Sequence, residues 1–198
     1  MVESLSNLPL IPKVLESLIL PTHRLKGISN WLLLANTLSD EGITDEYNLA
    51  GVAATVLVET TREFEPIEEF GQIGYFVRSY WRDSKVRKSL GNIQESDSYA
   101  YKGRGFIQIT GRANYGQAQL ALGVPLLDHP ELALEPETSA RILLWYWKKK
   151  KLDLLCPQAD TQNKQNQLLV WQTCRRRVNG GLNGFDDFLR YLQAFEVA

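Results

Sequence analysis

Glutamates are concentrated in one short stretch of the chain. Residues 58–70 read VETTREFEPIEEF, and five of these thirteen positions are glutamate. Two carboxyl groups that face one groove can hydrolyse a glycosidic bond, because one protonates the leaving oxygen while the other activates water or acts as the nucleophile. Whether a pair of these glutamates is placed in this way depends on the elements that carry them.

The first candidate is Glu59, at the end of a predicted helix. Apolar spacing predicts a helix over 45–61, which opens with two acidic residues that suit a helix N-terminus. Glu59 then lies on the inward face with Thr55 and Val56, at i−4 and i−3. Apolar surroundings disfavour a charged carboxyl group, and a general acid must hold a proton. We therefore expect Glu59 to be half-buried and to act as the acid.

The second carboxylate is expected from the loop that follows. Glu68 and Glu69 arrive about ten residues after Glu59, and in an extended stretch their side chains point in opposite directions, so only one can face the acid. Residue types alone leave open which one it is. The two intervening glutamates are expected to have capping or surface roles: Glu63 and Glu65.

The remaining pattern predicts a mainly α protein. Apolar residues recur at helical spacing in five further segments, the last opened by Asn183 as a cap: 27–40, 112–123, 135–151, 164–178 and 184–196. Residues 71–111 look irregular, because they are rich in Gly, Ser, Asp and Asn. Within them, the alternating run at 106–110 predicts a short strand that presents Gln108 and Thr110 on one face.

Composition narrows the class of protein. With 198 residues, 44% hydrophobic, we expect a single domain over 1–198. No apolar run reaches the roughly 18 residues of a membrane span, so we expect no stable membrane insertion. The net charge is −1, which argues against a nucleic-acid partner. The start of the chain has an acidic residue where a secretory signal would be basic, and prolines interrupt its apolar run, so no classical export signal is expected.

Cysteine and histidine are scarce. Cys156 and Cys174 form no CxxC pair, and the only histidines are His23 and His129, so no metal site is expected. Buried free thiols are the favoured interpretation, with a disulfide between the two cysteines left open.

Three motifs, in order over residues 45–195, go beyond composition. They read GVAATVLVETTREFEPIEEFG at 51–71, YKGRGFIQITGRANYGQAQLALG at 101–123 and RRRVNGGLNG at 175–184. Together they resemble glycoside hydrolase family 19, the chitinase and phage endolysin group. The resemblance implies a bilobal, mainly α, lysozyme-like fold with a short strand or small sheet beside the cleft. It also implies an inverting mechanism without a cofactor.

The resemblance also implies roles for individual residues. Glu59 matches the general acid, Glu69 best matches the second carboxylate with Glu68 as the neighbouring candidate, and Thr110 matches the residue that holds the attacking water. Further positions match residues that contact substrate or line the cleft: Gln108, Asn114 and Asn179, and more weakly Tyr101 and Arg104.

The chain departs from the family pattern at several positions. The common histidine before the acid is Val58, and the small glycines after the Glu-Thr pair are Thr61 and Arg62. Residues 71–98 lack a firm match. Neither carboxylate is affected, so the expectation of activity stands, while the bulk of Arg62 could alter substrate fit.

Peptidoglycan is the expected substrate, with cleavage between N-acetylmuramic acid and N-acetylglucosamine. Two cysteines and no appended module resemble phage or bacterial lysis enzymes more than plant chitinases. Alternatives are a chitinase, a catalytically silent wall-binding module and a structural protein that shares the fold. We expect a monomer made in the cytoplasm, delivered to the wall through a holin-like pore or by phage-tail or injection machinery.

Overall fold

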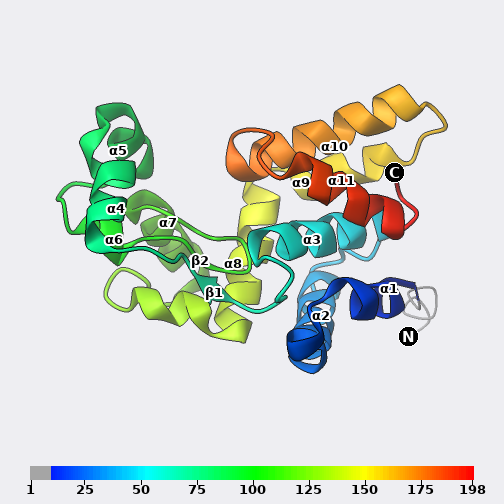
Figure 1. Cartoon of the computed structure of the whole chain (residues 1–198), viewed down its shortest axis with the longest axis horizontal. Helices are drawn as coiled ribbons and strands as arrows, with labels where there is room; N and C mark the ends of the chain where they lie inside the picture. The colour runs from blue at the N-terminus through cyan, green and yellow to red at the C-terminus, as the bar shows by residue number, and fades with distance from the viewer. Residues whose placement is uncertain (1–9) are drawn as a thin grey trace. The chain divides into compact units, whose positions relative to one another are not determined.

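The computed structural model describes residues 10–198, which divide into two compact units. Unit 1 joins the chain up to Glu65 with Tyr146–Ala198, and unit 2 is Pro66–Trp145. Figure 1 shows the helices and the small sheet. The expected mainly α architecture with a small sheet is confirmed, and the expectation of one domain stays a prediction.

Unit 1 is entirely helical in the part that the structure describes. Its elements are α1 (Leu10–Leu18), η2 (Pro21–His23), α2 (Arg24–Ser39), α3 (Glu46–Glu59), α9 (Leu152–Leu155), η5 (Cys156–Ala159), α10 (Lys164–Asn179) and α11 (Phe185–Ala194).

Unit 2 combines short helices with the sheet. Its elements are β1 (Ile67–Glu68), α4 (Ile73–Val77), the π-helical turn η3 (Arg78–Arg82), α5 (Ser84–Leu90), α6 (Asp97–Ala100), β2 (Arg104–Gly105), α7 (Arg112–Leu122) and η4 (Pro130–Leu134). The helix α8 (Pro136–Lys149) starts in unit 2 and ends in unit 1.

The core of unit 1 is built on α3, which carries Glu59. Asp45 caps this helix by accepting a hydrogen bond from the backbone N–H of Asn48, at 2.9 Å. All residues from 48 to 57 are buried. At Gly51 an added Cβ would lie 3.4 Å from the Trp147 ring and from Cys156 Sγ, so neighbouring elements pack directly on the helix backbone. A helix buried on all sides holds its last residue rigidly.

A left-handed turn follows the acid. Thr61, Arg62 and Phe64 have φ values of 48°, 69° and 56°, a region that favours glycine. The turn is held because Thr60 Oγ1 accepts a hydrogen bond from the N–H of Phe64 at 3.0 Å, and Phe64 is fully buried. The backbone therefore keeps a glycine-like conformation although the expected glycines are absent.

The sheet of unit 2 fixes the second group of glutamates. β1 and β2 pair antiparallel, with Ile67 opposite Gly105 and Glu68 opposite Arg104. Gly105 has φ 83°, and an added Cβ would lie 2.6 Å from Ser139 Oγ. That hydroxyl also accepts a hydrogen bond from the N–H of Phe106 at 2.8 Å. Only glycine fits this approach of the sheet to α8.

Three predictions of local structure were wrong. Residues 106–108 form a turn, since Gln108 has φ 51° and Ile109 bridges back to Arg104. Ile107 and Ile109 are buried while Gln108 and Thr110 are partly accessible, as the alternation predicts, but Phe106 is buried as well. The stretch 71–111, predicted to be irregular, contains short helices. The last helix begins at Phe185 with Gly184 at the N-cap position and no side-chain cap, so Asn183 is not its cap.

The remaining long helices, and the buried free thiols, are confirmed. Cys156 and Cys174 are both buried, with their sulfur atoms 3.3 Å apart. Over residues 10–198 no helix has the length and apolar character needed to span a bilayer. The same residues hold no cluster of three His, Cys, Asp or Glu side chains that could bind a metal.

Candidate active site

Glu59 is the last residue of α3, and its side chain is 16% exposed. Its Oε1 accepts a hydrogen bond of 2.5 Å from Nη1 of Arg175 on α10, whose side chain is only 4% exposed. Arg175 Nε in turn donates to the carbonyl oxygen of Asn183 at 2.8 Å. The half-buried position expected for Glu59 is observed, but its neighbour is a fixed guanidinium as well as apolar groups.

The Asn-Gly-Gly turn after α10 holds this guanidinium in place. Asn179 donates from Nδ2 to the carbonyl oxygen of Asn183 at 2.9 Å and accepts from the N–H of Gly181 at 2.9 Å. Its side chain therefore shapes its own turn, at an exposed position of unit 1.

Gly184 allows the turn to pack against the end of α3. Its φ is 70°, and an added Cβ would lie 2.9 Å from Val58 Cγ1 and 3.3 Å from Arg175 Nη2. Val58, at the position of the family's histidine, is thus a packing residue beside the acid.

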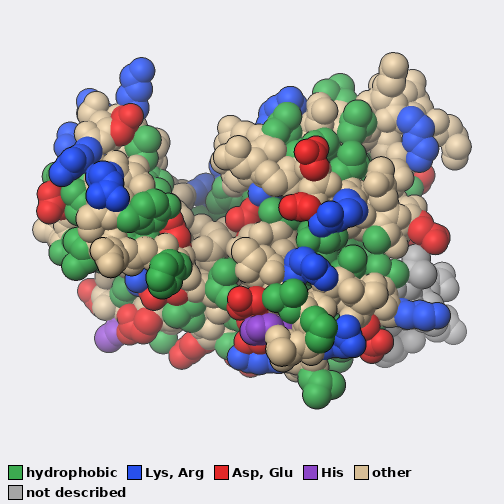
Figure 2. Space-filling model, viewed as in Figure 1, with side chains coloured by type: hydrophobic (Ala, Val, Ile, Leu, Met, Phe, Trp, Pro, Cys, Tyr) green, Lys and Arg blue, Asp and Glu red, His purple; other side chains and the backbone are tan. Residues whose placement is uncertain are grey.

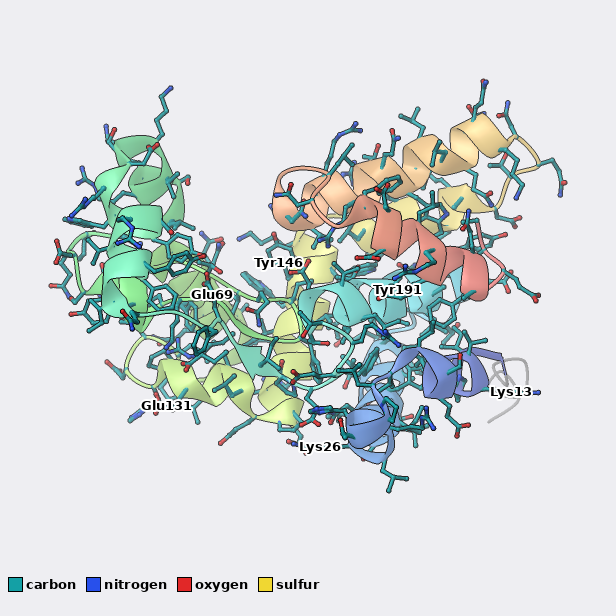
Figure 3. All side chains as sticks on the ribbon, viewed as in Figure 1. Lys13, Lys26, Glu69, Glu131, Tyr146 and Tyr191 are labelled. Carbon is teal, nitrogen blue, oxygen red and sulfur yellow. The ribbon has the colours of Figure 1, made fainter. Side chains whose placement is uncertain are left out.

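Tyr146 is the third side chain near Glu59, and Figure 3 labels it on α8. Its hydroxyl donates to the carbonyl oxygen of Val178 at 2.8 Å. Burial, and to a smaller degree the negative charge of Glu59, raise the pKa of Tyr146 to about 12. Tyr146 therefore stays a neutral donor at any ordinary pH.

Glu68 of unit 2 is paired with two cations. Its Oε1 accepts from Arg104 Nε at 2.8 Å, and its Oε2 lies 3.1 Å from Lys102 Nζ. Its side chain is 41% exposed, while that of Arg104 is 7% exposed. Arg104 also donates to the hydroxyl of Tyr115 at 3.1 Å. Arg104, expected to line the cleft, is a buried anchor for Glu68.

Glu69 has neutral partners instead. Its Oε1 accepts from the hydroxyls of Tyr75 and Tyr80, at 3.1 and 2.7 Å, and its Oε2 accepts from the N–H of Gly103 at 3.0 Å. The charge of Glu69 and burial raise the pKa of Tyr75, while burial first and then the bond to Glu69 raise that of Tyr80. Both hydroxyls thus remain donors, and Glu69 ties β1, α4 and η3 together.

The polar residues of the middle motif form a chain of hydrogen bonds beside this sheet. Gln108 donates from Nε2 to the carbonyl oxygens of Ile67 and Gly105, at 2.9 and 3.0 Å. Thr110 Oγ1 donates to the Gln108 carbonyl at 2.9 Å, and Asn114 Nδ2 donates to the Thr110 carbonyl at 2.8 Å. Gln108, Thr110 and Asn114 are each partly accessible, as a site that binds sugar requires.

Tyr101 lies apart from these groups. It is 6% exposed, and its hydroxyl donates to the carbonyl oxygen of Leu127 at 3.0 Å. Its ring packs against Tyr115, with centroids 5.3 Å apart. In the structure Tyr101 supports the core of unit 2.

Sequence reasoning missed the residues that hold the glutamates. They are Arg175, Lys102, Tyr75 and Tyr80. A signal existed for Arg175, which lies four residues before Asn179 and hence on the same side of its helix. Tyr75 and Tyr80 lie in the stretch that lacks a family match, so nothing in the sequence connected them to Glu69.

The two groups of carboxylates differ in a chemically useful way. Glu59 uses Oε1 for Arg175, and across residues 10–198 no hydrogen bond engages Oε2. Glu68 is more exposed, and its two oxygens contact Arg104 and Lys102. Glu59 can therefore direct a carboxyl oxygen toward a leaving group, and Glu68 is accessible to water.

Comparison with known proteins supports the motif assignment. The family model described as Chitinase class I, glycoside hydrolase family 19, matches residues 46–159, which is more than half of the chain. The matched region contains Glu59, Glu68 and Glu69, and it ends before Arg175.

Two curated relatives illustrate the range of similarity. A protein from Haemophilus influenzae described as glycosyl hydrolase family 19 domain-containing is 32% identical over 111 residues, covering 56% of this chain and 48% of that protein. Endochitinase A2 of Pisum sativum is 50% identical over 48 residues, covering 24% of this chain and 15% of the enzyme. The chain thus spans about half the length of the Haemophilus protein and less of the plant enzyme.

Solved structures share the fold. Chitinase C from Streptomyces griseus HUT6037 superposes with a TM-score of 0.54 at 21% identity, covering 92% of this chain and 73% of that chain. A bacterial family 19 chitinase gives a TM-score of 0.53 at 18% identity, with 86% of each chain covered. At these identities the comparison establishes the architecture alone.

Proposed function

Because the chain belongs to glycoside hydrolase family 19, we propose that it is a glycosidase that hydrolyses β-1,4 bonds between amino sugars, with bacterial peptidoglycan as its substrate. The observation that carries the proposal is the pair of differently held carboxylates, Glu59 and Glu68, among the family's motifs. The reaction needs one acid, one base and a water molecule.

Glu59 is the general acid. Its Oε1 is fixed by Arg175, so Oε2 has a defined direction toward the leaving oxygen. Arg175 then orients the donor, as a preorganised neighbour should.

Glu68 is the base that activates water. A base needs both contact with water and a free lone pair. Glu68 is 41% exposed and lies at the edge of the sheet, whereas Glu69 already accepts three hydrogen bonds. We therefore rank Glu68 ahead of Glu69, which reverses the order that the family resemblance implied, and give Glu69 the task of positioning β1.

Thr110, Gln108 and Asn114 complete the site of unit 2. The Thr110 hydroxyl donates to a carbonyl and has lone pairs left to accept a hydrogen bond from water. The Gln108 amide donates twice, so its Oε1 is fixed in direction and can accept from a sugar hydroxyl or acetamido group. In unit 1, Asn179 is exposed, and we propose it as a further sugar-binding residue.

Digestion of purified peptidoglycan tests the proposal, with chitin oligomers in parallel. Fragments are identified by mass spectrometry and by their reducing ends. We expect muropeptides that end in N-acetylmuramic acid. Fragments that end in N-acetylglucosamine would contradict the bond assignment, and binding to sacculi without any cleavage would point to a silent wall-binding module.

Chitin is the second candidate substrate. The pea relative is an endochitinase and both structural neighbours are chitinases, so a site for N-acetylglucosamine polymers is the natural alternative. Release of chitin fragments together with inert peptidoglycan would establish it in place of the muramidase.

A further inference from the structure

Unit 2 carries a cluster of cations on the segment that follows Glu69. Of the nine Lys and Arg residues of this unit, five lie within 78–88, where Asp83 is the only acidic residue. In Figure 2, Lys and Arg side chains gather over the region of α4 and α5. Four of the five are exposed, and we call them the cationic face: Arg78, Arg82, Lys85 and Lys88.

The charges of the cationic face are not used inside the protein. Among residues 10–198 none of its four members forms an ion pair, in contrast to Lys102 and Arg104, which both pair with Glu68. The nearby Asp83 caps the N-terminus of α5, where its Oδ1 accepts hydrogen bonds from the N–H groups of Lys85 and Val86 at 2.7 and 3.2 Å. The face therefore remains available to an external anion.

Helix electrostatics explains only part of the cluster. Lys88 lies in the last turn of α5, where a cation is favoured by the helix dipole. Lys85 lies in the first turn, where a cation is disfavoured. Like charges placed close together also repel, so this arrangement gains stability when a polyanion lies across it.

The cationic face is held close to the candidate base within the same unit. Tyr80 lies between Arg78 and Arg82 on η3 and donates its hydroxyl to Glu69 at 2.7 Å. Glu69 is the chain neighbour of Glu68. Asn92 fixes the other side of η3 by donating to the carbonyl oxygen of Tyr80 at 3.2 Å. The segment that carries the cationic face is thus bonded, through Tyr80, to the residue next to Glu68.

We propose that the cationic face binds the free carboxylates of the peptide stems of peptidoglycan. This inference rests on the proposed function and refines its substrate to anionic, peptide-bearing strands. Chitin is neutral and offers these cations no partner. Peptide stems branch from the sugars of the strand that is cut, so their carboxylates come within reach of cations beside the site, whereas other wall polyanions are not tied to the scissile bond.

Binding to sacculi tests the proposal without relying on turnover. In a Glu59→Gln background, a triple variant (Arg82→Gln, Lys85→Gln, Lys88→Gln) is compared with a control that loses the same charge from exposed sites of unit 1 (Lys13→Gln, Arg24→Gln, Lys164→Gln). Cosedimentation with Gram-negative sacculi, which lack teichoic acids, gives the affinity. Circular dichroism checks that both variants are folded.

We expect the triple variant to bind about tenfold more weakly, as the loss of several exposed charge pairs implies, and the control to bind within about twofold of the parent. Added salt should weaken the parent more than the triple variant. A charge-preserving variant (Arg82→Lys, Lys85→Arg, Lys88→Arg) should bind like the parent. Sacculi whose stem carboxylates are capped with glycinamide should bind parent and triple variant alike.

Equal binding by the triple variant and the control would overturn the proposal. So would a tenfold loss that persists on the capped sacculi, because the anion would then not be a stem carboxylate. Measuring turnover by the protein with Glu59 intact distinguishes failure of this proposal from failure of the proposed function. If the protein cleaves peptidoglycan but the triple variant binds sacculi like the control, only the proposal for the cationic face is wrong. If the triple variant binds more weakly but the protein cleaves no glycan, the proposed enzymatic activity is wrong and the binding role of the cationic face stands.

Discussion

The carboxylate of unit 1 and those of unit 2 are held in opposite ways. Glu59 ends a helix whose residues 48–57 are all buried, and its Oε1 accepts a hydrogen bond from a guanidinium that is itself fixed by a backbone carbonyl. Glu68 ends the two-residue strand β1 and Glu69 follows it directly, and together they engage two cations, two tyrosines and a backbone N–H. A rigid helix end suits a single directed proton transfer, while a strand edge open to solvent suits activation of water.

The largest expected effect comes from removing the acid. Glu59→Gln should lower turnover by about two to four orders of magnitude, the usual contribution of a general acid, while binding of glycan strands persists. Initial rates on the cleaved substrate measure it. Glu63→Gln, four residues further along, is the matched control and should stay near the parent rate. An unchanged rate in Glu59→Gln would remove Glu59 from the mechanism.

Substitutions of the two glutamates of unit 2 should differ in their effect on turnover. Glu68→Gln should lower turnover about 100-fold or more, since it loses the base. It should also lower the free energy of unfolding by about 1–3 kcal/mol, because the buried Arg104 loses its partner. Glu69→Gln should lower the free energy of unfolding by about 1–2 kcal/mol, because one acceptor of a hydrogen-bonded set is lost, with turnover within about tenfold of the parent. Rates and urea titrations of both variants decide the matter. The opposite pattern would make Glu69 the base.

Loss of the guanidinium should cost stability as well as activity. Arg175→Gln leaves Glu59 half-buried without its cation, which should lower the free energy of unfolding by about 1–3 kcal/mol. Combining it with Glu59→Gln should cost less than the sum of the two single variants, because the unpaired charge is gone. The exposed neighbour Arg176 provides the control, and Arg176→Gln should change stability little. Additive effects would show that the pair is not coupled.

Tyrosine titration compares the two units directly. Burial raises the pKa of both Tyr146 in unit 1 and Tyr115 in unit 2 to about 12. The charge of Glu59 adds to the rise at Tyr146, whereas at Tyr115 the neighbouring Arg104 opposes it and the nearby glutamates add to it. Glu59→Gln should therefore lower the pKa of Tyr146 and leave that of Tyr115 unchanged. Tyrosinate absorbance measures both, with Tyr146→Phe and Tyr115→Phe identifying the signals.

The raised pKa values of the buried tyrosines determine how the stability of the protein changes with pH. A tyrosine whose pKa is higher in the folded state than its ordinary 10.0 binds its proton more tightly when folded. Its contribution to stability is complete below pH 10 and is lost as the pH rises through about 12. Melting temperatures that stay constant through this range would contradict the burial of these hydroxyls.

The smallest effect concerns the turn after the acid. Thr61 is exposed and has φ 48°, a left-handed conformation that costs a residue with a side chain about 1 kcal/mol or more. Thr61→Gly should keep this conformation and remove its steric cost. Part of the gain is offset by the greater freedom of glycine in the unfolded chain. We expect a slightly higher melting temperature and an unchanged rate. A lower melting temperature would mean that Thr61 makes a stabilising contribution of its own.

Sequence predicted the parts of the fold that are governed by local periodicity. The long helices repeat apolar residues at helical spacing, and the position of Glu59 on an inward face followed from Thr55 and Val56. The turn at 106–108 could not be predicted in this way, because burial of Phe106 and the left-handed Gln108 depend on the contact of Gly105 with Ser139, 34 residues away. Tertiary contacts determine the conformation of residues 106–108.

The candidate site was predicted by motif where the chain keeps the family's residues. The glutamates, Gln108 and Thr110 were found in this way. Their partners were not, because the bonds of Arg175 to Glu59 and of Tyr80 to Glu69 join segments 116 and 11 residues apart with no pattern that connects them. Only the folded chain shows which donor meets which carboxylate.

The anomeric form of the first product tests the central claim most directly. If Glu59 protonates the leaving oxygen while Glu68 activates water, a β-linked substrate must give the α-anomer, because water attacks the opposite face of the sugar in one step. Proton NMR recorded within the first turnovers, before mutarotation, distinguishes the anomers. The account predicts the α-anomer; the β-anomer would indicate a covalent intermediate and contradict the roles assigned to both carboxylates.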